Sequence, residues 1–157
     1  MKSNKHIDKV DKKILAILQK NGRIAMTELA EQVGLSVTPV TERVRRLERE
    51  NIIMGYYTRL NPHALGQNLL VFVEIKLMRT SGDIFEQFKK ATLKIPEILE
   101  CHLVSGEYDY LIKVRLNDMS AYRKVLGNIL LALPEAQESR SYIVMEEIKE
   151  DILLKVE

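Results

Sequence analysis

The chain has 157 residues, which is enough for one large domain or two small ones. Its only cysteine, Cys101, excludes an intrachain disulfide and a multi-cysteine metal site, and it fits a reducing compartment. The longest apolar stretch, 69–73, is too short to span a bilayer, and the lysine-containing start lacks the apolar core of a signal peptide. We therefore expect a soluble cytoplasmic protein without membrane contact.

Charge is divided unevenly along the chain. Residues 1–60 contain 12 Lys and Arg against 7 Asp and Glu, a net charge of +5. Residues 61–157 contain 12 and 15, a net charge of −3, so the overall +2 hides a basic front and an acidic back. Affinity for a polyanion is therefore expected in the first 60 residues.

The first 50 residues predict three short helices. The first follows a capping aspartate, Asp8 or Asp11, and stops at Asn21–Gly22. The second ends at Gly34, a residue that tolerates the left-handed backbone of a tight turn. Apolar residues recur at helical spacing in both: Val10, Ile14, Leu15 and Leu18, and then Leu29, Ala30 and Val33.

The third helix begins at Ser36 and has the features of a recognition helix. The Ser36 hydroxyl is expected to cap it, and Pro39 lies in the first turn, where its missing N–H costs nothing. Val40, Val44 and Leu47 form one buried edge, and the opposite edge carries groups that suit base edges and phosphates in a major groove. The residues expected to bind DNA are Ser36, Thr38, Thr41, Glu42, Arg43, Arg45, Arg46 and Arg49.

A charged helix face is often only a solvated face, and Glu42 with Arg46 has the spacing of an ordinary ion pair. Between Thr27 and Leu47, however, a helix, a glycine turn, a cap and several arginines occur at fixed offsets. That combination is typical of a helix-turn-helix. We predict a DNA-binding helix-turn-helix domain over residues 1–60 that ends in a hinge strand, Ile52–Thr58.

Residues 61–157 predict a second domain with the element order βαββαβ. One helix is expected after Ser81 and another up to Pro134. Alternating or continuous apolar patterns predict the strands 71–78, 98–105, 110–116 and 141–148. The predicted fold class is α+β, with a ferredoxin-like four-stranded sheet whose helices cover one face.

The other sheet face is expected to be apolar enough to need a cover. It should carry Leu70 and Phe72 beside Glu74 and Lys76, together with Tyr142 and Val144. An uncovered apolar face of this kind marks an interaction surface. A second copy of the same chain is the expected partner.

The strings ERVRRLER, LLVFVEI, ECHLVSGEYDY and YIVMEEI, with the order helix-turn-helix, hinge and βαββαβ domain, resemble the Lrp/AsnC (feast/famine) family of transcription regulators. The resemblance covers essentially the whole chain. It implies DNA binding as homodimers that pair through the four-stranded domains and often assemble into octamers. It also implies an effector, commonly an amino acid, bound between subunits in the C-terminal domain.

The resemblance further implies an effector site at the loop between the second and third strands. In chemical terms, Asp109 suits an ammonium group and Gly106 lets backbone N–H groups approach a carboxylate. Met119, Ile143 and Val144 suit an apolar recess, although a purely structural turn at Gly106–Asp109 is the alternative. The implied effector-binding residues are Ser105, Gly106, Glu107, Tyr108, Asp109, Met119, Tyr142, Ile143 and Val144.

An enzyme is disfavoured, because the adjacent Cys101 and His102 would point to opposite faces of a strand. The sequence contains no phosphate loop, metal cluster or cofactor motif, so neither a cofactor nor a metal is expected.

The predicted function is sequence-specific transcription regulation through double-stranded DNA, with leucine or methionine as the suggested effector. An effector-independent architectural DNA-organising protein is the alternative. The operator, the sign of regulation and the choice between dimer and octamer are not predicted.

Overall fold

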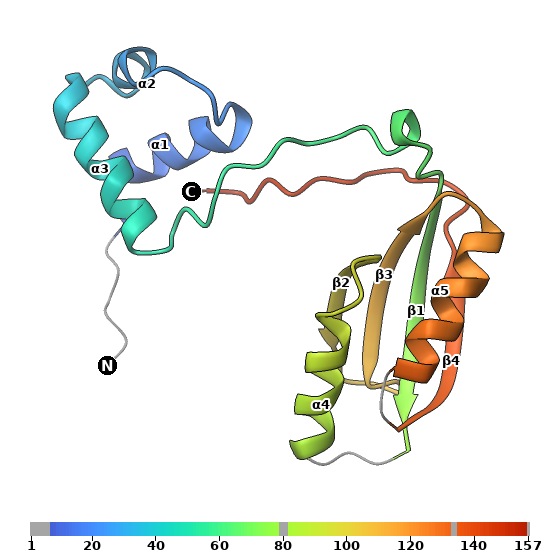
Figure 1. The fold of residues 1–157 in the computed structure, drawn as a ribbon. Helices are drawn as coiled ribbons and strands as arrows, with labels where there is room; N and C mark the ends of the chain where they lie inside the picture. The colour runs from blue at the N-terminus through green and yellow to red at the C-terminus, as the bar shows by residue number, and fades with distance from the viewer. Residues whose placement is uncertain (1–6, 79–81, 133–134, 157) are drawn as a thin grey trace. The chain divides into compact units, whose positions relative to one another are not determined.

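The structure is a computed structural model that describes residues 7–78, 82–132 and 135–156, and the chain divides into two compact units (Figure 1). The helical unit contains residues 1–59 and 149–157, and the sheet unit contains residues 60–148. Each unit has its own apolar core, as expected of separately folding domains. None of the helices in the described ranges is long and apolar enough to cross a membrane.

Three helices form the helical unit: α1 (Lys9–Lys20), α2 (Met26–Val33) and α3 (Val37–Arg49). At the start of α1, Asp8 accepts a hydrogen bond from the Asp11 N–H at 2.8 Å, and Asp11 accepts one from the Asp8 N–H at 3.1 Å. This reciprocal capping box fixes where the helix begins. α2 ends at Gly34 with φ 76°, so the predicted left-handed turn is confirmed.

The N-terminus of α3 differs from the prediction in one respect. Ser36 occupies the N-cap position, but its side chain makes no capping hydrogen bond, so the predicted hydroxyl cap is wrong. A capping hydroxyl bonds the N–H of the second or third helical residue, and the third residue here is Pro39, which has no N–H. The predicted buried edge is confirmed, because Val40, Val44 and Leu47 are all buried.

The segment after α3 forms no strand in this chain, contrary to the predicted hinge strand Ile52–Thr58. The N–H groups of Ile52 and Ile53 instead donate to the Leu47 carbonyl at 2.9 and 3.1 Å and close the end of α3. The last residues return to the helical unit, which the sequence did not predict. There the Gln19 side-chain amide donates to and accepts from the Leu154 backbone at 3.0 and 2.7 Å.

The sheet unit consists of a short η1 turn (His63–Leu65), β1 (Leu69–Leu77), α4 (Gly82–Thr92), β2 (Ile98–Leu103), β3 (Tyr110–Leu116), α5 (Met119–Ala132) and β4 (Ala136–Ile143). The strands are antiparallel in the order β2-β3-β1-β4. Both helices lie on one face of the sheet (Figure 1). The predicted α+β fold with its βαββαβ order is therefore confirmed.

The core of the sheet unit lies between the sheet and its two helices. Alternate residues of β1 point into it, and Val71, Val73 and Ile75 are fully buried. Phe88 of α4 is also fully buried and stacks on Tyr110 of β3, with 3.8 Å between ring centroids. This packing fixes the sheet from which the second candidate site projects.

The fourth strand begins five residues earlier than predicted, at Ala136 instead of Ser141. Pairing with β1 decides its position, because Ser139 lies opposite Ile75 and Ile143 opposite Val71. Beyond Ile143, only the Val144 N–H continues the pairing, to the Leu70 carbonyl at 3.0 Å, because β1 itself begins there. The second strand also ends two residues earlier than predicted, at Leu103. The predicted helix limits Ser81 and Pro134 lie outside the described residues.

Candidate DNA-binding and effector sites

One edge of α3, here called the outer edge, faces away from the helical core. Thr38, Glu42, Arg45 and Arg49 are exposed along it. Arg45 pairs with Glu42 at 3.1 Å, with the two side chains 67% and 65% exposed, so this ion pair is weak in water and easily exchanged for a ligand. Such an edge can present guanidinium, hydroxyl and carboxylate groups to base edges and phosphates.

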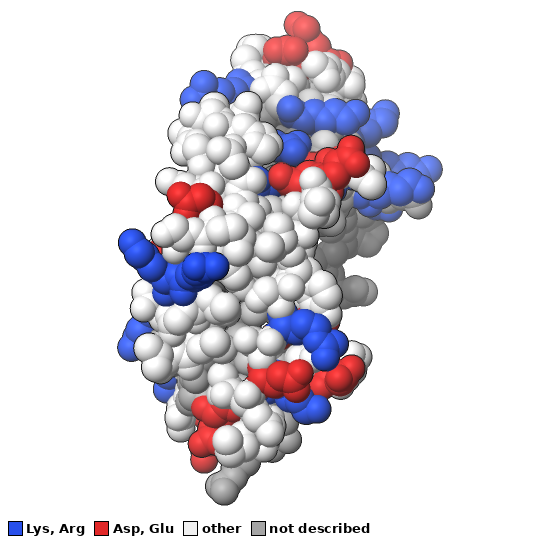
Figure 2. Space-filling model, turned by 90° about the vertical axis from the view of Figure 1, so that its right-hand side faces the viewer, with Lys and Arg blue, Asp and Glu red and all other residues white. Residues whose placement is uncertain are grey.

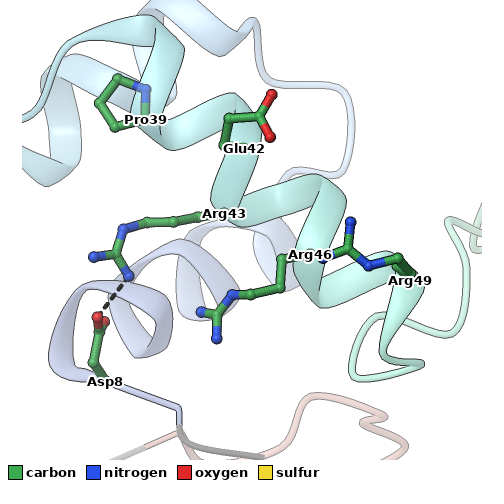
Figure 3. Close-up of a pocket in the computed structure, with 6 residues that line it drawn as sticks. All are labelled: Asp8, Pro39, Glu42, Arg43, Arg46 and Arg49. Carbon is green, nitrogen blue, oxygen red and sulfur yellow. Dashed lines mark hydrogen bonds and ion pairs between the residues drawn. The ribbon is translucent and has the colours of Figure 1, made fainter.

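Two predicted DNA-binding arginines point instead toward the start of α1 (Figure 3). Arg43 Nη1 donates to Asp8 at 2.6 Å and to Asp11 at 2.8 Å, and Arg46 Nη2 donates to Asp11 at 2.5 Å. The Asp11 side chain is fully buried, whereas the arginine side chains are each 30% exposed. We call Asp8, Asp11, Arg43 and Arg46 the inward ion cluster. It joins α1 to α3.

The acidic members of the inward ion cluster are held in the ionised form. Burial raises the pKa of Asp11, but hydrogen bonds from Arg46, the Asp8 backbone and Arg43 outweigh it, and the pKa lies below its ordinary value. The pKa of Asp8 is lowered by the Asp11 backbone N–H and by Arg43. The same side-chain hydrogen bonds raise the pKa of both guanidinium groups. The cluster therefore carries two negative and two positive charges at neutral pH.

The other predicted DNA-binding residues divide by exposure. Ser36 is exposed at the start of α3, whereas Thr41 is half-buried and its hydroxyl donates to the Val37 carbonyl at 2.9 Å. Two residues that the sequence reasoning missed are also exposed, Leu35 at 38% and Val37 at 40%. Apolar side chains beside a recognition helix suit the methyl group of thymine. Leu35 precedes α3 and Val37 lies three residues before Val40, so helical spacing gives no signal that either side chain is exposed.

In the sheet unit, the loop between β2 and β3 borders a hollow of about 220 Å³, here called the loop hollow. Gly106 has φ 150°, which residues with a Cβ rarely adopt, and the space beside it is open. Of the predicted effector residues, Ser105, Gly106, Glu107, Tyr108 and Tyr142 line the hollow; Glu74, Val104 and Arg140 also line it and were not predicted.

Opposite charges lie side by side in the loop hollow. Glu74 of β1 is directly opposite Arg140 of β4 in the strand register. The Tyr142 hydroxyl donates to Glu74 at 2.9 Å, and the Arg140 guanidinium lies 5.0 Å from the centroid of the Tyr108 ring. A carboxylate, a guanidinium and aromatic walls together match a ligand that carries an ammonium, a carboxylate and an apolar side chain.

Asp109 has a structural role in the single chain and does not line the loop hollow. Its carboxylate accepts the Leu77 N–H at 2.7 Å, and its own N–H donates to the Ile75 carbonyl at 3.0 Å. These bonds attach the start of β3 to the end of β1. Within one chain, the Asp109 side chain therefore has the structural role that the sequence analysis left as an alternative to effector binding.

Within one chain, the residues of the predicted apolar recess, Met119, Ile143 and Val144, do not all lie on one side of the sheet. Ile143 lies opposite Val71, on the face that the helices cover, whereas Tyr142 lies on the open face. Adjacent strand residues point to opposite faces of a sheet, so Ile143 and Val144 cannot line the same side of a pocket. Met119 begins α5 on the helix-covered side and is 42% exposed.

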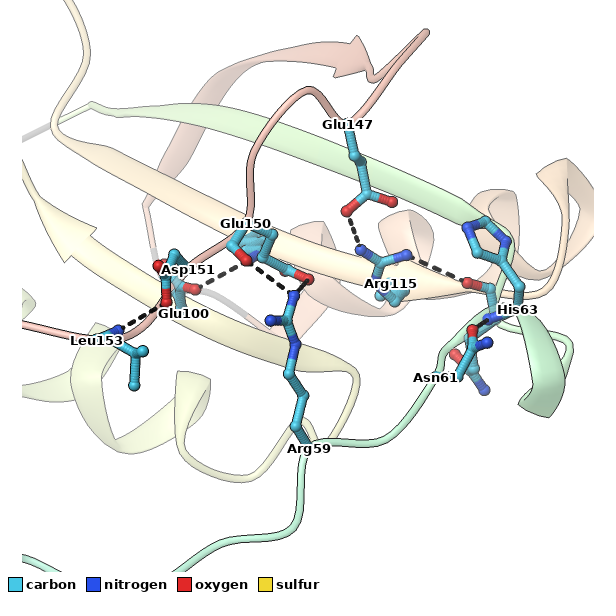
Figure 4. A network of polar contacts seen from close by, with 11 residues as sticks. Arg59, Asn61, His63, Glu100, Arg115, Glu147, Glu150, Asp151 and Leu153 are labelled. Atoms are coloured by element: carbon cyan, nitrogen blue, oxygen red, sulfur yellow. Dashed lines mark hydrogen bonds and ion pairs between the residues drawn. The ribbon is translucent and has the colours of Figure 1, made fainter. Parts of the chain in front are cut away.

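The open sheet face mixes apolar and charged groups more than predicted. Phe72 lies between Lys113 and Tyr142 in the strand register, and Lys113 donates to Glu100 at 3.1 Å. Arg115, only 8% exposed, donates to Glu147 and to the Gln67 carbonyl (Figure 4). On the side of the molecule where α5 and β4 lie, charges of both signs are scattered among uncharged groups (Figure 2).

The geometry of Cys101 and His102 does not support nucleophilic catalysis. Cys101 packs against the core opposite Ile112, and burial raises the pKa of its thiol. The His102 side chain is 58% exposed and lies 3.3 Å from Glu100. A thiol with a raised pKa is a poor nucleophile. Within the described residues, no group of three or more His, Cys, Asp or Glu side chains could hold a metal ion.

Comparison with known proteins agrees with this division into two sites. Residues 7–54 match the family model described as winged helix-turn-helix DNA-binding, and residues 70–154 match the Lrp/AsnC ligand binding domain. The chain is 58% identical over 146 residues to the leucine-responsive regulatory proteins of Escherichia coli K12 and Klebsiella pneumoniae, which covers 93% of this chain and 89% of each relative.

Two similar solved structures contain an amino acid. One is a transcriptional regulator from Neisseria meningitidis in complex with L-methionine, with a TM-score of 0.88, 35% identity, and coverage of 96% of this chain and 97% of that one. The other is the feast or famine regulatory protein of Mycobacterium tuberculosis complexed with L-methionine, with a TM-score of 0.83, 31% identity, and coverage of 95% and 99%.

A winged helix-turn-helix joined to an amino acid ligand-binding domain defines a DNA-binding transcription regulator and not an enzyme. The protein belongs to the Lrp/AsnC family.

Proposed function

We propose that this regulator reads DNA with the outer edge of α3 and responds to a free amino acid, methionine or leucine, bound in the loop hollow. The observation that carries the effector proposal is that Glu74 and Arg140, opposite each other in the strand register, both line the loop hollow beside Tyr142. Arg140 would donate to the ligand carboxylate and Glu74 would accept from its ammonium group. The two relatives with bound L-methionine support this ligand class.

On the DNA side, the proposed contacts come from side chains that are exposed and weakly engaged. Arg45 and Arg49 would reach guanine or phosphate, and Thr38 and Glu42 would lie near base edges. A homodimer in the cytoplasm would present two such edges to half-sites about one helical turn apart, or a multiple of that.

Effector binding and assembly would be linked through the open sheet face. Glu74 and Tyr142 project from that face beside Phe72, where a second copy would pack. A ligand in the loop hollow would therefore lie at the border of an interface between subunits. It can shift assembly only as far as its affinities for the two assembly states differ.

Calorimetry of the full-length protein with leucine, methionine, alanine, lysine and glutamate tests the effector proposal. We expect heat with leucine or methionine and its loss in Arg140→Ala. Arg123→Ala, which removes an exposed arginine from α5 in the same unit, should bind as the wild type does. No heat with any of these amino acids would contradict the proposal and favour the architectural DNA-organising alternative.

Asp109→Ala separates two roles of that residue. If Asp109 only holds the loop, the variant should lose hydrogen-exchange protection at the Leu77 amide while some amino acid binding remains. If Asp109 meets the ammonium group directly, the heat of binding should vanish while DNA binding persists. Gly106→Val should affect binding more broadly, because a β-branched residue disfavours this φ and blocks close approach to the backbone.

A further inference from the structure

The inward ion cluster links α1 to α3 through several shared hydrogen bonds. Asp11 Oδ1 accepts from Arg43, and Oδ2 accepts from Arg46 and from the Asp8 N–H. Arg43 is bound to Asp8 as well. One turn of α3 is thereby fixed against the first turn of α1 (Figure 3).

Stability alone explains this cluster poorly. Removing charges from water costs free energy that pairing often only offsets, and apolar replacements of buried ion pairs are frequently neutral or stabilising. The helical unit already has an apolar core in which Ile14, Leu29 and Leu47 are fully buried. Guanidinium–carboxylate hydrogen bonds contribute geometric specificity, because they hold the arginine side chain in one orientation.

We propose that Asp11, assisted by Asp8, is a specificity-determining positioning residue that withholds Arg43 and Arg46 from DNA phosphates and fixes how α3 presents its outer edge. Contacts to phosphates strengthen binding to every DNA sequence alike, because they carry no sequence information. With two of the four α3 arginines held back, base contacts by the outer edge contribute a larger share of the affinity. The inference rests on the proposed use of that edge against DNA.

The test uses Asp11→Asn in the full-length protein, which removes the charge and keeps the size. Affinity is measured over a range of salt concentrations for two duplexes of equal length, one enriched from a random library by the wild-type protein and one scrambled. We expect the slope of log affinity against log salt to steepen by about 0.9 for each released arginine that gains a phosphate. Affinity for the scrambled duplex should rise, and the ratio of the two affinities should fall.

Two matched variants isolate the cause. Glu31→Gln makes the same charge change at an exposed position of α2 and should keep the wild-type slope. In the Asp11→Asn background, Arg43→Gln with Arg46→Gln should return the slope to the wild-type value. If Asp11→Asn does not fold, single variants still decide: Arg43→Gln and Arg46→Gln should each leave the wild-type slope unchanged, because neither guanidinium is expected to contact a phosphate.

Equal weakening of both duplexes at an unchanged slope would make Asp11 purely structural and overturn the inference, as would a slope made shallower by about 0.9 in Arg46→Gln. A wild-type affinity that does not depend on salt is a separate outcome. That result would remove the proposed use of the outer edge itself.

Discussion

The helical unit completes its candidate binding surface within one chain, whereas the sheet unit leaves its candidate site on a face that no helix covers. In the helical unit, the buried Asp11 accepts hydrogen bonds from Arg43 and Arg46, so contacts within one chain hold these two arginines inward. In the sheet unit, Glu74 and Tyr142 project from the open face beside Phe72. DNA recognition is therefore expected to be a property of each chain, and the effector response a property of what covers the sheet.

The two units also distribute charge differently. Of the four arginines of α3, Arg43 and Arg46 point inward, and Arg45 and Arg49 lie on the outer edge, which remains basic. The sheet unit pairs charges across its strands, as in Glu100 with Lys113. A field of one sign attracts a polyanion over a distance, whereas paired charges give short-range specificity. This difference fits DNA for the first unit and a small zwitterion for the second.

The largest expected effect is on stability, and it tests whether the two apolar cores unfold independently. Leu47 is fully buried in the helical unit, so Leu47→Ala should lower the unfolding free energy of that unit by about 2–5 kcal/mol. Hydrogen exchange read by mass spectrometry should show lost protection in α3 and unchanged protection in β1. Phe88→Ala is the matched variant of the other core and should give the reverse pattern. Loss of protection in both units from either change would show that they do not fold separately.

Local patterns predicted the parts of the fold that local forces decide. Helical spacing and the turn at Gly34 located the three N-terminal helices, and apolar residues at every second position located β3 at Tyr110–Leu116. β4 was misplaced because its first residues, such as Gln137 and Glu138, show no apolar alternation. Pairing with β1 determines its position, and that depends on residues far away in the sequence.

The residues of the candidate sites were predictable from the sequence only where they all lie on one helix or strand. The exposed residues of α3 follow from helical spacing, but the inward turn of Arg43 depends on Asp8, 35 residues earlier. Likewise, the pairing of Glu74 with Arg140 depends on the register between β1 and β4. The return of Leu154 to Gln19 spans 135 residues, and no local pattern indicates it.

A second prediction concerns the open sheet face. Phe72→Glu should weaken self-association by about 100-fold, or about 2.8 kcal/mol, because it places a charge in the expected interface while Lys113 across from it is already bound to Glu100. Sedimentation velocity measures this shift. Leu131→Glu introduces the same charge on α5, where the side chain is 89% exposed, and should leave assembly unchanged. A wild-type protein that sediments as a monomer at micromolar concentration would contradict the expected dimer.

A third prediction tests the independence of the two sites. Arg45→Ala should weaken binding to the enriched duplex by about 1–3 kcal/mol if its guanidinium reads a base, without changing the heat of amino acid binding. Arg140→Ala should do the opposite, losing the amino acid and keeping DNA affinity in the absence of effector. Fluorescence anisotropy and calorimetry on both variants give the comparison. An equal loss on the scrambled duplex would reassign Arg45 to a phosphate.

The smallest expected effect is a difference in acid response. Hydrogen bonds from His102 and Lys113 lower the pKa of Glu100, and a hydrogen bond from Arg115 lowers that of Glu147, each from an ordinary value of 4.5. Asp8 and Asp11 in the helical unit are lowered from 3.8. A carboxylate with a lowered pKa stabilises the fold above its ordinary value, and this contribution is lost as the pH falls through the lowered value.

The sheet unit should therefore begin to lose stability near pH 4.5 and the helical unit only near pH 3.8. Amide NMR signals of Ile112 and Ile14, followed during acid titration, report the two units separately. Glu100→Gln with Glu147→Gln should flatten the first part of the sheet unit's response, whereas Glu86→Gln on the exposed side of α4 should not. If Ile14 responds at a higher pH than Ile112, the ion pairs of the open face do not hold the sheet unit as the structure indicates, and the comparison between the two units fails at this point.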